Sequence, residues 1–258
     1  MRLRAGIWRT YKNGRPSISA RNTPMLSTLA RDRLASGRLG KTAVDMLGAN
    51  PPARQDNRQT LIDATLASVA EIGLIRTSVS EIITRAGLSR GMIHLHFQGK
   101  DNLLAAAAKH SSERYYKRLD QYLRDAKPDP QYRIEALIQC DLSEDGLTED
   151  IVRITHEFQA ATRAFPILAP YSDTRDARLR RYFEEAFTEI MIQTGETDPS
   201  QVSRDITTGL VATMEGFWVD FLLHPQDFDR ARAARIVFRM LSGLLPDYFD
   251  LNGAKAPN

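Results

Sequence analysis

The sequence predicts an all-α fold in which a small N-terminal group of three helices is joined by one long helix to a larger helical domain. Two observations support this prediction. From residue 54 onwards, apolar residues recur three or four positions apart, which is the spacing of amphipathic helices, and Gly, Pro and Asp residues separate one such stretch from the next. No stretch alternates apolar and polar residues for long enough to build a sheet, and no internal repeat is visible.

The first predicted helix covers about residues 54–72. Its apolar residues follow one another at steps of four, three and three, and Gly73 closes the helix. These apolar residues are Ile62, Leu66, Val69 and Ile72.

Two short helices follow, over residues 78–86 and 89–97. The first begins with Ser and Glu three positions apart, which is the spacing of a capping box, and it ends at a glycine. The second has a serine in the capping position and two apolar residues one turn apart. The residues behind these assignments are Ser78, Glu81 and Gly87 for the first helix and Ser89, Ile93 and Phe97 for the second.

A long helix begins at about Lys100 and runs to the stop at residues 127–130, Lys-Pro-Asp-Pro. It connects the three-helix group to the remaining part of the chain. Further helical stretches lie at about residues 130–142, 148–164, 167–194, 201–223 and 229–245.

The composition is that of a soluble globular protein. The chain has 258 residues, of which 42% are hydrophobic and 26% charged, so one large domain or a small module fused to a larger one fits best. No uncharged apolar run approaches the ~18 residues of a membrane span. The single cysteine, Cys140, cannot form an intrachain disulfide, and the acids near it discourage a reactive thiolate, so we expect a buried structural residue. We therefore expect a cytoplasmic protein with no membrane partner.

The first 53 residues differ from the rest of the chain in charge and in pattern. They hold ten Lys and Arg residues against two acids, a net charge of +8, whereas residues 54–258 hold 25 against 30, a net charge of −5. They lack a sustained apolar period and end at Pro51-Pro52, so residues 1–53 are predicted to be a flexible basic arm that folding does not need. Two alternatives stay open: residues 1–45 as an upstream extension of the reading frame, and an organelle transit peptide.

The second and third helices, joined by a turn at Gly87, form a helix-turn-helix motif. This motif places its second helix in the major groove of DNA, so we predict double-stranded DNA as a partner. Arg90 offers two donors to guanine O6 and N7, and Gly91 lets the backbone approach the groove. Lys100 begins the next helix, where a cation opposes the helix dipole unless an anion such as a phosphate lies nearby.

Residues 77–104, TSVSEIITRAGLSRGMIHLHFQGKDNLL, resemble the signature of the TetR family of bacterial repressors. The resemblance covers residues 55–104. Beyond it, residues 59–65 and the triplet at 216–218, Gly-Phe-Trp, resemble the choline-responsive, BetI-like branch of that family.

The resemblance implies a homodimeric repressor. Residues 54–100 would form the helix-turn-helix DNA-binding domain, and residues 101–250 a helical domain that binds a small effector and dimerises, followed by a tail at 251–258. The basic arm at 1–53 would at most add salt-sensitive, sequence-independent affinity for DNA.

The resemblance also assigns the DNA-binding residues. The family commonly carries tyrosine where His94 stands, so its base preference is not carried over. Base-facing positions are matched by Arg90, Gly91 and His94, phosphate-facing positions by Met92, His96 and Lys100, and Ser78 completes the DNA-binding set.

Two long apolar helices near the C-terminus are expected to form the dimer interface. The helix at 201–223 is apolar on two sides, so one side would face the partner and the other the chain's own core or effector cavity. With the helix at 229–245 it would build a four-helix bundle across the two-fold axis, and a monomer with a fully enclosed helix is the alternative. The predicted interface residues are Ile206, Leu210, Phe217, Phe221, Ile236 and Met240.

The predicted effector site combines a carboxylate with aromatic rings. Glu215 and Trp218 lie about one turn apart in an otherwise apolar helix, and the branch resemblance places His156, Glu157 and Phe158 nearby. An aromatic face and a carboxylate suit a cationic or amine-bearing effector. In the alternative, Trp218 is a core or dimer anchor, and Glu215 pairs with an arginine across the dimer.

No motif of a nucleophilic, phosphate-binding or dinucleotide-binding enzyme is present, and the histidines lack partners at metal-ligand spacing. We therefore expect no enzymatic activity, no cofactor and no metal. The sequence predicts a ligand-responsive transcriptional repressor that a small-molecule effector releases from its operator. A transcriptional activator of the same fold is one alternative, and a helical ligand carrier or enzyme, which would not retain operator DNA, is another.

Overall fold

The computed structural model describes residues 56–256, apart from the side chains of residues 173–176. The predicted basic arm at 1–53 and the start of the predicted helix at 54–72 lie outside these residues. Within the described range the chain forms nine α-helices, one short 3₁₀ helix and a two-stranded hairpin, so the predicted all-α class is confirmed.

The N-terminal group has the three helices that the sequence predicts. Asp56 and Ser78 cap the first two helices with their side chains, and Ser78 accepts a hydrogen bond from the backbone N–H of Glu81, as its spacing predicts. Gly87 ends the second helix at φ 65°, a left-handed conformation that favours glycine. The helices are α1 (Asn57–Ile72), α2 (Val79–Ala86) and α3 (Arg90–Phe97).

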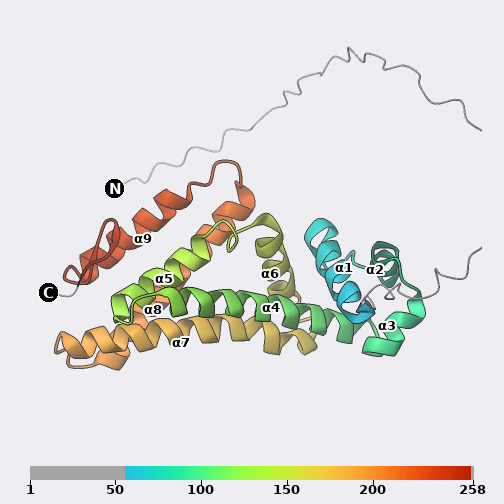
Figure 1. Cartoon of the computed structure of the whole chain (residues 1–258), viewed down its shortest axis with the longest axis horizontal. Helices are drawn as coiled ribbons and strands as arrows, with labels where there is room; N and C mark the ends of the chain where they lie inside the picture. The colour runs from blue at the N-terminus through green and yellow to red at the C-terminus, as the bar shows by residue number, and fades with distance from the viewer. Residues whose placement is uncertain (1–55, 257–258) are drawn as a thin grey trace, which may run out of the picture. The chain divides into compact units, whose positions relative to one another are not determined.

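The long helix α4 leads from this group into the body of the protein, where it packs against α5 and α7, and α8 packs along α7 (Figure 1). The helix predicted at 148–164 ends earlier, and the residues after it form a separate 3₁₀ helix that starts at Pro166. The elements are α4 (Lys100–Asp125), α5 (Pro130–Leu142), α6 (Glu149–Ala161), η1 (Pro166–Leu168), α7 (Ala169–Gln193), α8 (Pro199–Leu223) and α9 (Arg230–Leu244).

Residues 249–254 form a hairpin that overlaps the tail predicted at 251–258. Strands β1 (Phe249–Asp250) and β2 (Gly253–Ala254) pair in an antiparallel hairpin, and the Phe249 ring is buried 6.4 Å from the ring of Phe238. A boundary after residue 250 therefore cuts through a packed element. Strands of two residues are too short to produce a recognisable alternation, which is why the sequence does not predict them.

The apolar core has two clusters, and their boundary differs from the predicted domain boundary at residue 100. One cluster lies among α5, α7, α8 and α9, with residues from the second half of α4. The other lies under α1, α2 and α3 but also includes Leu103 and Leu104 of α4 and Ile154 and Phe158 of α6. The N-terminal three-helix group therefore shares its core with the helical body, because α4 runs through the boundary and α6 packs on α1.

Helix α8 is long and apolar enough to cross a membrane by length and composition alone. The structure buries 33% of its most apolar 18-residue stretch. The sequence shows no uncharged membrane span here, because Glu215 and Asp220 interrupt the apolar residues of this helix. Its residues Leu210, Met214 and Trp218 are buried in the core beside α7. It is thus a core helix with one apolar side left uncovered.

Candidate DNA-binding helix and effector cavity

Helix α3 presents one exposed face. Ile93 and Phe97 are buried on the opposite side, which fixes the orientation of the helix on the body. The exposed residues fall at positions that share one side of a helix, and three of them are the predicted base-facing residues. They are Arg90, Gly91, His94 and Leu95.

The other predicted DNA-binding residues lie around that face. Met92 and His96 are half-buried; Met92 packs against the core below α3, and His96 Nε2 is buried with no hydrogen-bond partner among residues 56–256. Ser78 and Lys100 stand at the N-termini of α2 and α4, where backbone N–H groups and the helix dipole favour a phosphate. The placements of Ser78 and Lys100 are therefore compatible with contacts to the DNA backbone, whereas the buried Nε2 atom of His96 and the core-packed Met92 do not support their predicted phosphate-facing role.

Leu95 is a candidate DNA-binding residue that the sequence reasoning missed. Its side chain is 71% exposed, so it contributes little to the core. It follows His94 directly and lies one turn after Gly91, which is the signal that could have revealed it. An exposed aliphatic side chain at this position suits contact with a thymine methyl group in the major groove.

Hydrogen bonds hold α2 and the turn before it against α1. Arg85 of α2 donates to Glu71 of α1 at 2.6 Å and to Glu81 at 3.1 Å, and these bonds raise the pKa of the Arg85 guanidinium. Between the two helices, the buried hydroxyls of Ser68 and Thr77 lie 3.0 Å apart. The turn from α1 to α2 is therefore fixed by polar contacts on both sides.

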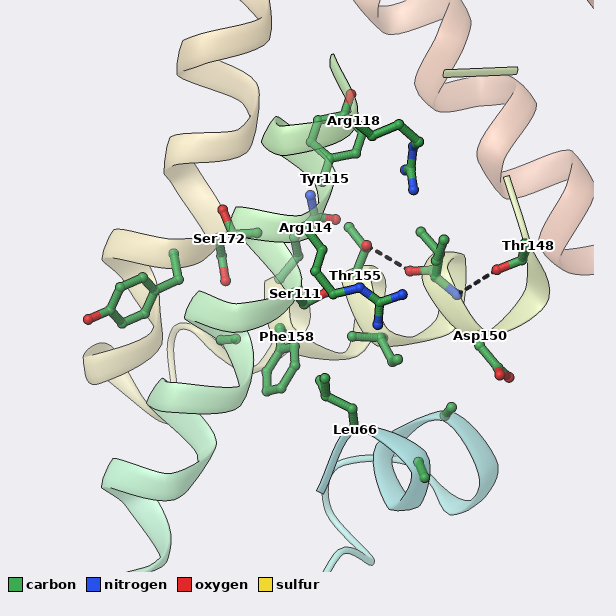
Figure 2. Close-up of a pocket in the computed structure, with 18 of the residues that line it drawn as sticks. Leu66, Ser111, Arg114, Tyr115, Arg118, Thr148, Asp150, Thr155, Phe158 and Ser172 are labelled. Atoms are coloured by element: carbon green, nitrogen blue, oxygen red, sulfur yellow. Dashed lines mark hydrogen bonds between the residues drawn. The ribbon is translucent and has the colours of Figure 1, made fainter. Parts of the chain in front are cut away.

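A cavity of about 660 Å³ lies between α1, α4, α6 and α7 (Figure 2). Its volume is within the roughly 300–1,000 Å³ typical of small-molecule sites. Helix α1 belongs to the DNA-binding group and α6 and α7 to the helical body, so an occupant would contact both. Its apolar wall includes Leu66, Ala70, Ile151, Ile154, Phe158 and Tyr171.

Of the five predicted effector residues, Phe158 alone lines this cavity. Trp218 is 1% exposed, and its indole N–H donates to Asp141 at 2.9 Å. Asp141 also accepts a hydrogen bond from the Tyr115 hydroxyl at 2.9 Å. The assignment of Trp218 and Glu215 to an effector wall is therefore corrected: Trp218 is a core anchor, and Glu215 is half-buried and is not among the residues that line the cavity. The alternative interpretation of Trp218 is the one that fits.

His156 and Glu157 lie on the side of α6 that faces the end of α1, beside a second hollow of about 570 Å³. The Glu157 carboxylate accepts a hydrogen bond from the backbone N–H of Leu74 at 2.8 Å. It also lies 3.2 Å from the place that a Cβ would take at Gly73, whose φ of +82° favours glycine. Glu157 therefore connects α6 to the turn that leads into α2, and it lines this second hollow in place of the cavity between α1, α4, α6 and α7.

The predicted dimer residues divide into four on α8, which pack against the chain's own core, and two on α9, Ile236 and Met240, which are exposed. Leu210 and Phe221 of α8 are buried in the chain's own core, and Ile206 and Phe217 are half-buried against the same core. The placement of Leu210 and Phe221 at an interface is therefore corrected. Their helix is apolar on two sides, and the sequence does not tell which side the chain covers itself. The large apolar residues left exposed on α8 and α9 are Val219, Leu223, Ile236, Met240 and Leu244.

Two family models match the chain. Residues 61–107 match the model of bacterial regulatory proteins of the tetR family, and residues 130–246 match the model of the C-terminal domain of BetI-type transcriptional repressors.

Curated relatives cover most of the chain. The HTH-type transcriptional regulator BetI of Stenotrophomonas maltophilia strain R551-3 is 28% identical over 181 residues, which span 70% of this chain and 89% of that protein. The HTH-type transcriptional regulator BetI 2 of Chromohalobacter salexigens is 29% identical over 195 residues, which span 74% of this chain and 89% of that protein.

Solved structures share the fold. A transcriptional regulator from Pseudomonas aeruginosa PAO1 has a TM-score of 0.65 at 24% identity and covers 72% of this chain and 89% of its own. A regulator from Saccharomonospora viridis in complex with choline has a TM-score of 0.61 at 16% identity. The match covers 72% of this chain and 95% of that chain. FadR from Bacillus subtilis in complex with stearoyl-CoA has a TM-score of 0.60 at 20% identity. The match covers 72% of this chain and 98% of that chain.

Proposed function

Because the chain belongs to the TetR family of bacterial transcriptional regulators and has a BetI-type C-terminal domain, we propose that it is a dimeric repressor that a small molecule releases from its operator. In this proposal α2 and α3 read the operator, with α3 in the major groove. The effector occupies the cavity between α1, α4, α6 and α7.

The observation that carries the proposal is the position of this cavity. Its walls come from α1, on which α2 and α3 are mounted, and from three helices of the body. A ligand changes DNA binding only if it binds one conformation of the protein more tightly than the other. A site built jointly by the DNA-binding group and the body meets this condition, since any movement of α1 relative to α6 changes the shape of the site.

The uncovered side of α8 and α9 supports a dimer. The hydroxyl of Thr213 on α8 lies 3.9 Å from the sulfur of Met240 on α9, so the exposed faces of the two helices adjoin. A second copy would cover these faces in a four-helix bundle with two-fold symmetry. Two reading helices would then contact operator half-sites about 34 Å apart.

The family consists of transcriptional regulators, and we propose no enzymatic activity. A regulator of this kind works on chromosomal DNA, which places it in the cytoplasm. The direct test is a gel-shift with DNA from upstream of its own gene and of the neighbouring genes, followed by footprinting. A retained fragment with a near-palindromic footprint is the expected result. Failure to retain any upstream fragment would contradict the proposal and favour a ligand carrier.

Activation in place of repression is the second candidate, because the same helix-turn-helix serves both. Transcription in vitro from the retained promoter, with and without the protein, distinguishes them. We expect the transcript to decrease when the protein is added, and an increase would identify an activator.

A further inference from the structure

The charged residues of the cavity between α1, α4, α6 and α7 differ in how far water reaches them. Asp63, Asp145 and Asp150 are exposed side chains, whereas Arg118 of α4 is half-buried. The Nε and Nη2 atoms of Arg118 are both buried, and neither has a hydrogen-bond partner among the residues whose side chains the structure describes, which are 56–172 and 177–256. Water weakens the field of the exposed carboxylates far more than that of an enclosed guanidinium. Arg118 is therefore the charge that an occupant of the interior would feel most.

The two unpaired atoms form one edge of the guanidinium group. The N–H bonds of Nε and Nη2 on this edge point in parallel, and a carboxylate accepts both at once in a bidentate pair. Buried donors without partners are uncommon in folded proteins, because each costs the free energy of its lost hydration. An edge of this kind on a cavity wall is a vacant place for an oxyanion.

Asp141 and Asp145 lie close enough to Cys140 to influence its thiol together with Arg118, but among the side chains that the structure describes no carboxylate is hydrogen-bonded to the Nε–Nη2 edge. The Tyr115 ring lies 5.7 Å from the guanidinium carbon and offers a cation–π contact, but it carries no charge. Burial raises the pKa of the Cys140 thiol to about 11, although the positive charge of Arg118 and a side-chain hydrogen bond with Arg118 oppose the rise, so the thiol carries no negative charge at physiological pH. Asp120, two positions further along α4, is paired with Arg178 at 2.9 Å.

Two further cavity residues add donors for an anion. Arg114 precedes Arg118 by one helical turn, and Figure 2 shows both guanidinium groups extending to the same side of α4. Ser172 on α7 is 7% exposed, and its hydroxyl is also buried without a partner among the described residues. The remaining wall is apolar and includes Leu66, Ile154 and Phe158.

We propose that the cavity binds an organic acid, with its carboxylate on the Nε–Nη2 edge of Arg118 and its apolar body against Leu66, Ile154 and Phe158. This inference rests on the proposed function, in which the cavity is the effector site. It reverses the charge of the effector expected from the sequence, because the Trp218 and Glu215 pair behind that expectation does not line the cavity. Arg114, which is exposed, would attract the acid toward the cavity and contribute less to its affinity.

The test compares three probes of matched length on the full chain by titration calorimetry. Octanoate carries the carboxylate, octanamide has nearly the same shape without charge, and octyltrimethylammonium carries the opposite charge. We expect octanoate to bind about ten-fold or more tightly than octanamide, since a charged hydrogen-bonded pair replaces a neutral one. The ammonium probe should bind more weakly than octanamide.

Variants of Arg118 test the assigned edge. Arg118→Gln should remove the preference for octanoate over octanamide, and Arg118→Lys, which keeps the charge without the parallel donors, should retain part of it. Arg124→Gln is the matched control, because Arg124 lies on the same helix, is exposed and is outside the cavity, so this variant should keep the wild-type preference. Both probes bind the same folded fraction of a variant, so the ratio of the octanoate and octanamide dissociation constants does not depend on folding stability. Melting curves show how much of each variant is folded.

Three results would overturn the inference: equal binding of octanoate and octanamide to the wild type, tighter binding of the ammonium probe, or an unchanged preference in Arg118→Lys and Arg118→Gln. Binding of none of the probes at millimolar concentration would overturn it as well. The proposed function is tested separately, by the gel-shift of the ligand-free protein. Loss of operator binding with an intact octanoate preference would contradict the repressor and leave the acid site standing.

Discussion

Arg90 and Lys100 are expected to contribute to DNA binding in different ways, since Arg90 stands on the exposed face of α3 and Lys100 at the start of α4. Arg90→Ala should cost about 1–3 kcal/mol and relax the preference at one operator position. Lys100→Ala should weaken binding to all sequences alike and reduce the salt slope by about one. Fluorescence anisotropy with operator and scrambled DNA at several salt concentrations measures both effects. An equal loss of specificity in the two variants would contradict this division of roles.

Leu95 gives the second prediction for a single residue. Leu95→Ala should weaken operator binding by about 1–2 kcal/mol, because it removes apolar surface that the groove would bury. Its Tm should match the wild type, since the side chain is already in water. Ile75→Ala is the control, because Ile75 is 92% exposed but lies in the turn between α1 and α2. A Leu95→Ala variant with wild-type operator affinity would remove Leu95 from the reading face.

Trp218 is expected to behave as a core residue. Trp218→Ala should destabilise the fold by about 3–5 kcal/mol, because it leaves a large cavity and removes a donor from Asp141. Trp218→Phe should cost less, since it keeps most of the ring volume. Urea unfolding of both variants measures these losses. An effector response that disappears at unchanged stability would restore Trp218 to a ligand-binding role.

At the scale of elements, α6 connects the cavity to the DNA-binding group. Phe158 lines the cavity, and its neighbour Glu157 accepts the hydrogen bond from Leu74 in the turn before α2. In the proposed function, a helix that contacts the cavity on one side and the turn on the other would couple the effector to the DNA-binding helices. The short turn is held from both sides, since Thr77 also bonds back to the carbonyl of Gly73 at 2.9 Å.

Removing the Glu157 carboxylate should loosen this link. In Glu157→Ala, the backbone N–H of Leu74 loses its acceptor, and its hydrogen exchange should accelerate about ten-fold or more. Glu157→Gln keeps an acceptor oxygen and should exchange at a rate closer to the wild type. Amide exchange followed by mass spectrometry or NMR measures the difference. Exchange of the Leu74 amide that is unaffected in Glu157→Ala would show that this contact does not hold the turn.

At the scale of the whole molecule, the apolar surface of α8 and α9 exceeds what one chain covers. Only 33% of the apolar window of α8 is buried, and Ile236, Met240 and Leu244 of α9 are exposed beside it. Exposed apolar patches of this kind mark association surfaces in soluble proteins. The dimer of the proposed function would cover them.

Met240→Asp should therefore convert the dimer to monomers. A carboxylate buried at the interface without a partner costs several kcal/mol, so we expect the dissociation constant to rise by about 100-fold or more. Arg235→Asp on the other side of α9 is the control; its pair with Asp229 is exposed and 3.9 Å long, so its loss should leave the dimer intact. Sedimentation velocity reports both. A Met240→Asp variant that sediments as the wild type does would place the interface elsewhere.

The sequence by itself determined the features that depend on near neighbours in the chain. The approximate positions of the helices, the Ser78 cap, the left-handed Gly87 and the helix-turn-helix all follow from spacings of one to four residues, because capping, turns and helical periodicity are local interactions. The family followed from the same segment. The predicted base-facing residues also fall on one exposed face, since a short helix with two buried residues has only one way to orient.

Only the tertiary structure decided which side of each helix the chain covers. Periodicity shows that α8 is apolar on two sides, but which side faces the core depends on packing against α7. Leu210 was therefore assigned to the dimer interface and Trp218 to the effector site, although the structure buries both in the chain's own core. The cavity likewise joins residues from Asp63 to Ser172, which no local pattern relates. Arg118 looks like any surface arginine in the sequence; its buried, unpaired edge exists because helices distant along the chain enclose it.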